Sequence, residues 1–416
     1  MPEKTTALAS PETVKRAYEI LKSPLFFRYF LEALEASGLV GEERNALVLL
    51  IVIVSRLLKR PLNAIVRGVS SAGKNFLISM ILRFLPARSK REIDSSSDRA
   101  WNYAGDSFRN VVVYIRERNK ITGSVHPMRT LISEGQIIHQ VTEWEGGQRI
   151  LRTYKVEGPV ACISTTNRDL EIDDQTRHIS LFMDESQEQT LRIAKAASRD
   201  SKGLAQSDLR VWRQIHSLIA ARANINVALP PWFEQIAGKV FIGDITIRRY
   251  FPAFVSACQT VCLIRSFQRE DWSNESGTIV VDFTDFAITA LLFEDVFVES
   301  MRCQEDSATE IAEEVRSISI RMGGIPVGAD DVARALNIEV QFAYKKLAKA
   351  AEAGTISRAN EPEKNNRKLF LPTPRPRFVP DPEELFQAIK DAGDQIRFVH
   401  PLTGERVVYT RSRKTA

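Results

Sequence analysis

Residues 68–75 read Gly68-Val-Ser-Ser-Ala-Gly-Lys-Asn75, which fits the pattern G-x-x-x-x-G-K of a phosphate-binding loop. In such a loop, glycines let backbone N–H groups turn toward a polyphosphate, and the lysine reaches its terminal phosphates. The pattern continues with Ser or Thr, whose hydroxyl binds Mg²⁺, but this chain has Asn75 there. We expect ATP to be bound by Gly68, Ser70, Ser71, Ala72, Gly73, Lys74, Asn75 and Phe76.

The sequence on either side of this loop supports the same interpretation. Leu62–Arg67 reads as a short buried strand, and Phe76–Leu85 reads as an apolar helix that Pro86 stops. A strand, a glycine-rich loop and a helix in that order make the motif credible, because the helix N-terminus favours anions. The alternative is an ordinary Ser/Gly turn before a helix.

Length, composition and net charge limit the classes of protein to which the chain can belong. The chain has 416 residues, 44% of them hydrophobic and 26% charged, which is typical of a globular protein of two to four domains. The net charge of +5 permits nucleic acid as a partner without demonstrating it. The N-terminus lacks a signal-peptide pattern, and the apolar run Ala46–Val54 is too short to span a bilayer. We therefore expect a cytoplasmic protein with no membrane partner.

The cysteines give no sign of a metal site. The chain has Cys162, Cys258, Cys262 and Cys303, and their spacing matches no metal-binding pattern. Cys258 and Cys262 lie on an apolar helix, where buried thiols are the ordinary interpretation.

The hydrophobic patterns predict an α/β fold. Pro11–Ala36, broken near Ser23-Pro24, and Glu42–Leu58 read as helices, and Val111–Ile115 and Val160–Ser164 read as buried parallel strands. We expect a P-loop parallel-sheet core with N-terminal helices, a helical middle region and a C-terminal winged helix-turn-helix. The predicted segments are N-terminal helices (1–60), P-loop core (61–200), helical region (201–305), winged helix-turn-helix (306–372) and a final linker, helix, hairpin and basic tail (373–416).

Polar residues that follow the predicted strands are candidates for phosphoryl-transfer chemistry. Glu117 follows the first of these strands and can orient an attacking water, while the preceding position, where an acid is expected to hold the metal, is Arg116. Asn167 follows the second strand and suits a sensor of the γ-phosphate, and Arg177 suits an arginine finger for a neighbouring subunit. The candidate catalytic residues are Lys74, Glu117, Asn167 and Arg177, and the candidate metal ligands are Asn75 and Glu117. Asp282 lies far downstream, and we interpret it as part of local structure.

Two segments carry residues suited to DNA. Gly135–Trp144 and Gln148–Val156 read as a hairpin whose cations, Arg149, Arg152 and Lys155, lie near aromatic Trp144 and Tyr154. Cations and aromatic rings hold single strands by phosphate contact and base stacking. The alternative is a solvated pair of edge strands.

The second DNA candidate is a helix-turn-helix with its turn at Asn337. Its second helix presents Gln341, Tyr344, Lys345 and Lys349 to duplex DNA, and leaves Phe342 and Leu347 for the core. Arg358, Lys364, Arg367 and Lys368 would belong to the wing. Such modules also dock proteins, which is the alternative.

Taken together, these motifs resemble a known family. The chain is similar to the AAA+-like helicase/ATPase region of primase-like replication proteins of phages and mobile elements, relatives of superfamily 3 and MCM-type helicases. The resemblance covers most of residues 12–372 and rests on the stretches Gly38–Glu42, Val54–Leu62, Ser70–Lys74, Leu131–Gly135, Glu157–Pro159, Thr165-Thr166, Leu181–Thr190 and Arg248–Tyr250. It implies a DNA-dependent ATPase that forms a homo-oligomer, with a hexamer as the expected ring. No zinc-ribbon or TOPRIM segment is recognisable, so primer synthesis is not implied.

Two departures from that family fall on the Mg²⁺ ligands. The family would have Ser or Thr at Asn75 and an acid at Arg116. These departures put Mg²⁺ in doubt and leave three hypotheses. They are a ring-forming helicase-like ATPase, a non-hydrolysing regulator or initiator whose DNA binding is gated by nucleotide, and a scaffold with a vestigial loop.

Overall fold

The structure of the protein is a computed structural model that describes residues 9–94, 100–118, 125–167, 172–198, 206–240, 245–269, 277–302, 308–352, 355–359, 368–373 and 377–411. The chain divides into two compact units. Unit 1 comprises Met1–Phe297 and Phe378–Ala416, and unit 2 comprises Val298–Arg377. The five segments predicted from the sequence divide the chain more finely, and their boundaries stay a prediction.

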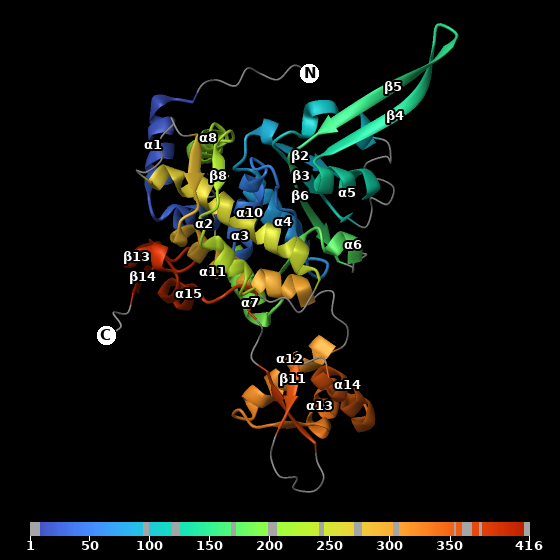
Figure 1. The fold of residues 1–416 in the computed structure, drawn as a ribbon, viewed down its shortest axis with the longest axis vertical. Helices are drawn as coiled ribbons and strands as arrows, with labels where there is room; N and C mark the ends of the chain where they lie inside the picture. The colour runs from blue at the N-terminus through green and yellow to red at the C-terminus, as the bar shows by residue number, and fades with distance from the viewer. Residues whose placement is uncertain are drawn as a thin grey trace. The chain divides into compact units, whose positions relative to one another are not determined.

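A five-stranded sheet in which all neighbouring strands are parallel forms the core of unit 1 (Figure 1). Its strands are β1 (Ala64–Arg67), β2 (Lys90–Ile93), β3 (Val111–Ile115), β6 (Val160–Thr166) and β7 (Ile179–Phe182). They lie in the order β2-β3-β6-β1-β7, so the strand that precedes the glycine-rich loop lies between β6 and β7. The predicted α/β P-loop fold with a parallel sheet is confirmed, and parallel pairing brings the carboxyl ends of β1, β3 and β6 to one edge.

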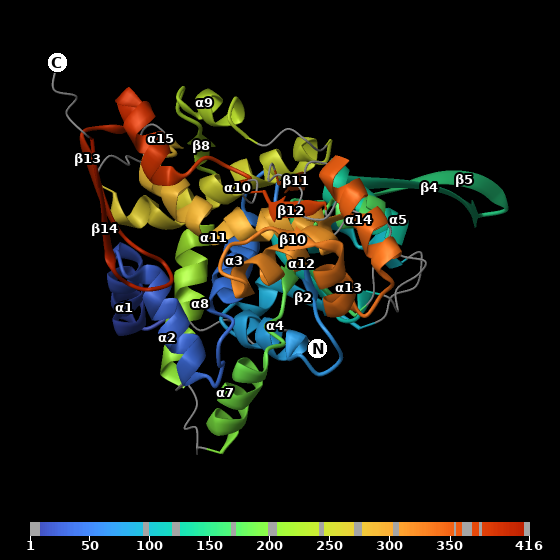
Figure 2. The same ribbon diagram turned by 90° about the horizontal axis from the view of Figure 1, so that it is seen from below.

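Helices cover the first face of the sheet. The N-terminal helices are α1 (Pro11–Lys22), α2 (Phe26–Ala36) and α3 (Glu43–Ser55), and α4 (Lys74–Leu82) follows the loop. The break predicted near Ser23 is present, with Ser23 as the C-cap of α1. In α3 every residue from Ala46 to Ser55 is buried, because the helix packs against α4, α10 and β6. Helix α1 packs against α8, which Figure 2 shows beside it.

The second face of the sheet carries a separate apolar cluster. Alternate residues of β3 point to opposite faces, and Val113 and Ile115 point to this one. They pack with α5 (Val125–Glu134), the short 3₁₀ helices η2 (Ala100–Tyr103) and η3 (Gly105–Phe108), and the base of a hairpin. The buried members are Trp101, Phe108, Val113, Ile115, Met128, Leu131, Ile137, Val156, Val160 and Cys162.

That hairpin is formed by β4 (Gln136–Glu145) and β5 (Gln148–Glu157), as predicted. Gly146 and Gly147 make the turn with φ of 61° and 82°, a left-handed conformation that favours glycine. Figure 1 shows the two strands extending beyond the sheet from their base beside α5. Their ends beyond the base are mostly exposed.

The remainder of unit 1 is mostly helical. Its elements are α6 (Ile172–Gln175), α7 (Gln187–Ala197), α8 (Gln206–Ala220), α9 (Phe233–Ala237), α10 (Ile247–Arg265), α11 (Phe283–Arg302), α15 (Pro382–Ala388), the parallel pair β8 (Asn226–Ala228) and β9 (Thr278–Val280), and the hairpin β13 (Gln395–Val399) and β14 (Arg406–Thr410). The last residues of α11 belong to unit 2. Asp282 pairs with Arg265 at 2.8 Å and accepts the backbone N–H of Asp285, which agrees with its interpretation as local structure. No helix among the described residues is long and apolar enough to cross a membrane.

Unit 2 contains three helices and a three-stranded sheet among its described residues. The elements are α12 (Ala308–Arg321), β10 (Val327–Gly328), α13 (Ala329–Leu336), α14 (Val340–Glu352), β11 (Ile356–Arg358) and β12 (Leu369–Pro372), with strand order β10-β12-β11. Asn337 turns the chain between α13 and α14 with φ of 54°. Helices α13 and α14 and strands β11 and β12 lie where the sequence analysis expected helices and strands, and the winged helix-turn-helix stays a prediction. The prediction that Phe342 belongs to the core is wrong, because its side chain is 51% exposed.

Candidate functional site

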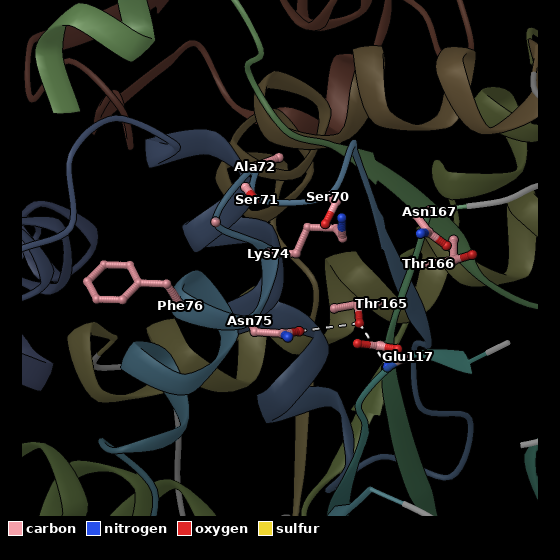
Figure 3. A pocket seen from close by; sticks show the side chains of 11 residues that line it. Ser70, Ser71, Ala72, Lys74, Asn75, Phe76, Glu117, Thr165, Thr166 and Asn167 are labelled. Carbon is pink, nitrogen blue, oxygen red and sulfur yellow. Dashed lines mark hydrogen bonds between the residues drawn. The ribbon is translucent and has the colours of Figure 1, made fainter. Parts of the chain in front are cut away.

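A pocket lies at the edge of the sheet where β1, β3 and β6 end. Its cavity volume is about 530 Å³, within the usual range for ligand pockets. Figure 3 shows side chains from the loop, from the end of β3 and from the end of β6 around the same space. The lining residues are Ser70, Ser71, Ala72, Gly73, Lys74, Asn75, Phe76, Glu117, Thr165, Thr166 and Asn167. The structure therefore brings together Glu117, Asn167 and the predicted loop residues except Gly68, which does not line the pocket.

Glycines set the path of the loop. Gly73 caps α4 with φ of 85°, a left-handed conformation that strains other residues. A Cβ on Gly68 would lie 3.0 Å from an oxygen of Glu185 and 3.2 Å from the Cβ of Ala72, so the backbone passes close to both. Because α4 begins at Lys74, the first N–H groups of the helix lack carbonyl partners within it and are suited to an anion.

Lys74 is held against the start of the loop. Its Nζ donates to the carbonyl oxygens of Gly68 at 2.6 Å and Val69 at 2.7 Å. Burial lowers the pKa of Lys74, against the opposing effect of the Glu185 and Glu117 carboxylates. The lysine therefore lies in the pocket lining with its ammonium group oriented by the backbone.

Glu185 contacts the loop without lining the pocket, and the sequence analysis assigned it no role. Its carboxylate accepts the N–H of Val69 at 2.6 Å. It lies three residues beyond β7, and the sequence analysis did not recognise β7 as a strand. A prediction of β7 as a neighbour of β1 would have placed Glu185 beside the loop.

Asn75 is fixed by hydrogen bonds to its side-chain oxygen. The hydroxyl of Tyr114 donates to Asn75 Oδ1 at 2.8 Å, and the hydroxyl of Thr165 donates to the same oxygen at 3.3 Å. Thr165 also accepts the backbone N–H of Glu117 at 3.1 Å. Burial raises the pKa of Tyr114 to about 12, so its hydroxyl stays protonated and remains a donor.

Arg116 does not line the pocket in this structure. Its guanidinium pairs with Glu92 of β2 at 2.7 Å and with Asp94 at 3.2 Å. It also lies over the ring of Tyr114, with 5.7 Å between the guanidinium carbon and the ring centroid. The positive charge at the usual acid position is thus neutralised by carboxylates at the neighbouring edge strand.

The residues present do not fit the Mg²⁺ site that P-loop enzymes use. Magnesium takes oxygen ligands, and the side chain of Asn75 has one oxygen, which already accepts two hydrogen bonds. Arg116 offers no acceptor. Among the described lining residues, Glu117 supplies the one carboxylate. The predicted metal ligand Asn75 is therefore not arranged as a ligand.

Arg177 lies away from the pocket of its own chain. Its Nε donates to Ser133 Oγ at 2.9 Å, and its guanidinium pairs with Asp173 at 2.6 Å. Arg249 and Arg129 also approach Asp173, at 3.5 and 3.8 Å. A group of arginines thus surrounds one half-exposed carboxylate.

Comparison with known proteins agrees with this geometry. A family model described as "MTBMA_p00010 P-loop domain" matches residues 11–220, which is half of the chain. The chain belongs to this P-loop family. The matched segment contains the loop, Glu117 and Asn167, so the pocket is that of a nucleotide-binding fold.

Two further comparisons were made. Curated proteins give no match. Among solved structures, the chain is similar to a full-length MCM homolog from Methanopyrus kandleri, with a TM-score of 0.44 and 14% sequence identity. The similarity covers 72% of this chain and 63% of that one.

The P-loop family match includes the hairpin. Most of the residues predicted to bind DNA there contact other side chains of the hairpin. Arg152 pairs with Glu143 at 3.1 Å and with Glu145 at 2.5 Å, and Lys155 pairs with Glu157. The guanidinium of Arg149 lies 5.2 Å from the ring centroid of Trp144, which is 68% exposed. The rings of Tyr154 and Tyr103 make an edge-to-face contact, and the hydroxyl of Tyr154 donates a hydrogen bond to Glu143.

The predicted DNA residues of α14 lie beyond the P-loop match and fall into two groups. Gln341, Lys345 and Lys349 are exposed. Tyr344 is half-buried, and its hydroxyl accepts a hydrogen bond from Lys368 of the wing at 2.9 Å. Arg358 of the wing is exposed, whereas Lys364 and Arg367 lie outside the described residues.

A metal centre of another kind has no support in the described part of the chain. No group of three or more His, Cys, Asp or Glu residues there is arranged to hold a metal ion. Cys258 and Cys262 are buried free thiols, as interpreted from the sequence, and Cys162 is a buried free thiol too. Cys303 lies outside the described residues.

Proposed function

We propose that this protein is an ATP-binding, helicase-like ATPase that assembles as a homo-oligomeric ring on DNA. Its place would be in the cytoplasm, in the replication of a phage or mobile element. The observation that carries the proposal is the convergence of Lys74, Glu117 and Asn167 on one pocket from three separate segments of the chain. Phosphoryl transfer depends on positioning and on charge stabilisation, and these residue types supply both.

Each of the three residues has a defined role in this proposal. Lys74 contacts the terminal phosphates, whose charge its ammonium group offsets. Glu117 accepts the proton of the attacking water, and its place beside Thr165 directs it toward the pocket. Asn167 donates to the γ-phosphate and relays the state of the nucleotide to β6.

A ring is proposed because Arg177 lies away from its own pocket. An arginine in trans stabilises the charge that develops on the transferred phosphoryl group. Arg177 is held by Asp173 and Ser133 in this chain, and in the proposed ring its guanidinium contacts the phosphates bound by a neighbouring subunit. A hexamer is the ring that the resemblance implies.

DNA contact is assigned to two surfaces. Arg149 and exposed Trp144 at the end of the hairpin suit single strands, by phosphate contact and base stacking. Gln341, Lys345 and Lys349 on one face of α14 suit the major groove of duplex DNA, with unit 2 acting as a winged helix.

A second candidate function is favoured by the contacts of Asn75 and Arg116. Turnover with magnesium normally uses an oxygen ligand at each of these positions, but the side-chain oxygen of Asn75 already accepts two hydrogen bonds and Arg116 has no acceptor. In this alternative the protein is a regulator or initiator in which ATP binding sets assembly and DNA affinity without hydrolysis.

Steady-state ATP hydrolysis separates these candidates. The rate is measured with Mg²⁺, with and without single-stranded DNA, for the wild type and for Lys74→Ala as the blank. A DNA-stimulated rate that Lys74→Ala abolishes supports the ATPase. A wild-type rate equal to the blank, together with DNA binding that ATP strengthens, supports the regulator.

A third outcome contradicts both candidates. If the wild type neither hydrolyses nor binds ATP, the loop is vestigial, and the protein is a scaffold. Equilibrium binding of labelled ATP, measured on the same preparations, identifies that outcome.

A further inference from the structure

The side chain of Asn75 is oriented by residues of two strands, β3 and β6. It stands at the second position of α4, and Tyr114 of β3 and Thr165 of β6 both donate to its Oδ1. Figure 3 shows Asn75 and Thr165 facing each other, with Glu117 beside Thr165. Because Thr165 accepts the N–H of Glu117, its own proton is available for Asn75.

This orientation leaves the amide nitrogen as the polar group that Asn75 offers to a ligand. Both acceptor sites of the oxygen are used, and the nitrogen carries two N–H donors. An N–H donor suits an anionic phosphate oxygen and cannot coordinate a cation. Asn75 lines the pocket, so a donor stands where P-loop enzymes present a metal-binding hydroxyl.

At the second metal position, residue 116, a hydrogen-bond donor again replaces an oxygen ligand. Arg116 occupies this position, paired with Glu92 and Asp94 and lying over the ring of Tyr114. Tyr114 thus contacts Arg116 through its ring and Asn75 through its hydroxyl. The replacements at both metal positions are therefore connected through one buried tyrosine, whose side chain is fully excluded from solvent.

We propose that Asn75 donates a hydrogen bond to the nucleotide's phosphates and that nucleotide binding at this loop needs no divalent cation. Lys74 and the first N–H groups of α4 supply the remaining positive potential. The inference rests on the proposed nucleotide site. It concerns binding alone and holds with or without hydrolysis.

The test is titration of the full-length protein with ADP and with ATPγS, in buffer that contains MgCl₂ and in buffer that contains EDTA. The expected dissociation constants of the wild type differ by less than about threefold between the two buffers. Binding that weakens by about tenfold or more in EDTA would overturn the inference. The proposed nucleotide site would then still stand, because binding persists with Mg²⁺.

Tyr114→Phe tests the role of the buried tyrosine. This variant removes one donor to Asn75 Oδ1 and frees a lone pair that a cation can use. We expect binding in EDTA to weaken several-fold relative to binding in MgCl₂, so that the ratio of the two constants rises. Equal losses in both buffers would indicate a structural effect and contradict the inference.

Tyr250→Phe is the matched control, since Tyr250 is also buried but lies on α10. The ratio of its dissociation constants in EDTA and in MgCl₂ should equal that of the wild type. If the wild type binds neither ligand in either buffer, the proposed nucleotide site itself is overturned, and this inference with it.

Discussion

His216 shows how a single buried residue can set the pH response of the protein. It lies on α8 with its side chain fully excluded from solvent, and neither ring nitrogen makes a hydrogen bond within the described part of the chain. Burial, with a contribution from the nearby charge of Arg56, lowers the pKa of His216 to about 3. The folded protein therefore holds this imidazole neutral where an unfolded chain would protonate it.

The expected consequence is a loss of stability in acid. The unfolded chain binds a proton at His216 below pH 6.5, and the folded chain does not until about pH 3, so the free energy of unfolding falls as pH drops through this window. The slope is about 1.4 kcal/mol for each pH unit from this residue. Urea unfolding of His216→Leu and of the wild type, each near pH 8 and about pH 5, measures the contribution of His216 to the pH dependence of the free energy of unfolding.

As the pH falls, the free energy of unfolding of His216→Leu should rise relative to that of the wild type, because leucine has no group that can bind a proton. His178 is also buried, with its pKa lowered to about 4, and it stays in both proteins. Parallel pH dependences of the two proteins would contradict the assignment to His216.

At the scale of elements, α14 has two faces with different partners. Leu347 belongs to the core of unit 2, together with Val332, Ala343 and Phe370. Phe342 stands on the exposed face, where the ammonium group of Lys346 lies 5.3 Å from its ring centroid. The side chains of this helix therefore divide between the core of unit 2 and the solvent-exposed surface.

A pair of substitutions tests this division. Leu347→Ala should lower the free energy of unfolding by about 2–5 kcal/mol, because it leaves a cavity in the core. Phe342→Ala should change it by less than about 0.5 kcal/mol, since the ring is half in solvent. Denaturant unfolding of both variants is the measurement, and a large loss for Phe342→Ala would contradict the exposed position.

The hairpin gives a second prediction at this scale. Glu143 and Glu145 neutralise Arg152, so they compete with any phosphate for that cation. The double variant Glu143→Gln with Glu145→Gln should bind single-stranded DNA about threefold or more tightly at low salt. Fluorescence anisotropy with a labelled oligonucleotide measures the change.

The control carries the same change of charge elsewhere. Glu12→Gln with Glu19→Gln alters two exposed acids of α1. If both double variants gain equally, general electrostatics explains the effect, and the hairpin has no special contact with DNA.

Elements with strong local signals were predicted well. The loop at Gly68, the buried run Val111–Ile115 and the glycine turn of the hairpin each specify their conformation within a few residues. Strand β2 was missed because Lys90-Arg-Glu-Ile93 has little apolar content. The short strand β7 was missed too, and with it the position of Glu185.

Side-chain direction was harder to predict than element type. The sequence places Arg116 at a metal position, and the carboxylates that pair with it come from a strand that was not recognised. The contact between Tyr114 and Asn75 joins residues 39 positions apart, and it depends on how β3 and α4 pack. No local pattern encodes such a contact.

At the scale of the whole molecule, the proposed ring places Arg177 at a subunit boundary. Arg177→Ala should abolish oligomerisation that depends on nucleotide, because the arginine would no longer reach the phosphates of a neighbour. Light scattering coupled to gel filtration, with and without ATPγS, measures the assembly state. The change should leave the mass of the nucleotide-free protein as it is in the wild type.

Arg210→Ala is the control, as Arg210 is an exposed arginine of α8. Its assembly should match the wild type. An Arg177→Ala variant that still assembles with nucleotide and hydrolyses ATP at the normal rate would refute the role in trans.

Residues that follow unit 2 in the sequence pack into the same core as residues that precede it. Phe378 stacks on Phe297 with 4.6 Å between ring centroids, and Glu294 accepts the backbone N–H groups of Phe378 and Val379. Unit 2, about 80 residues long, separates the two partners in the sequence. A ribosome that adds 5–20 residues per second needs roughly 4–16 seconds to make it. During that interval of synthesis Phe254 of α10 and Phe297 of α11 lack the aromatic partner that Phe378 supplies in the folded protein.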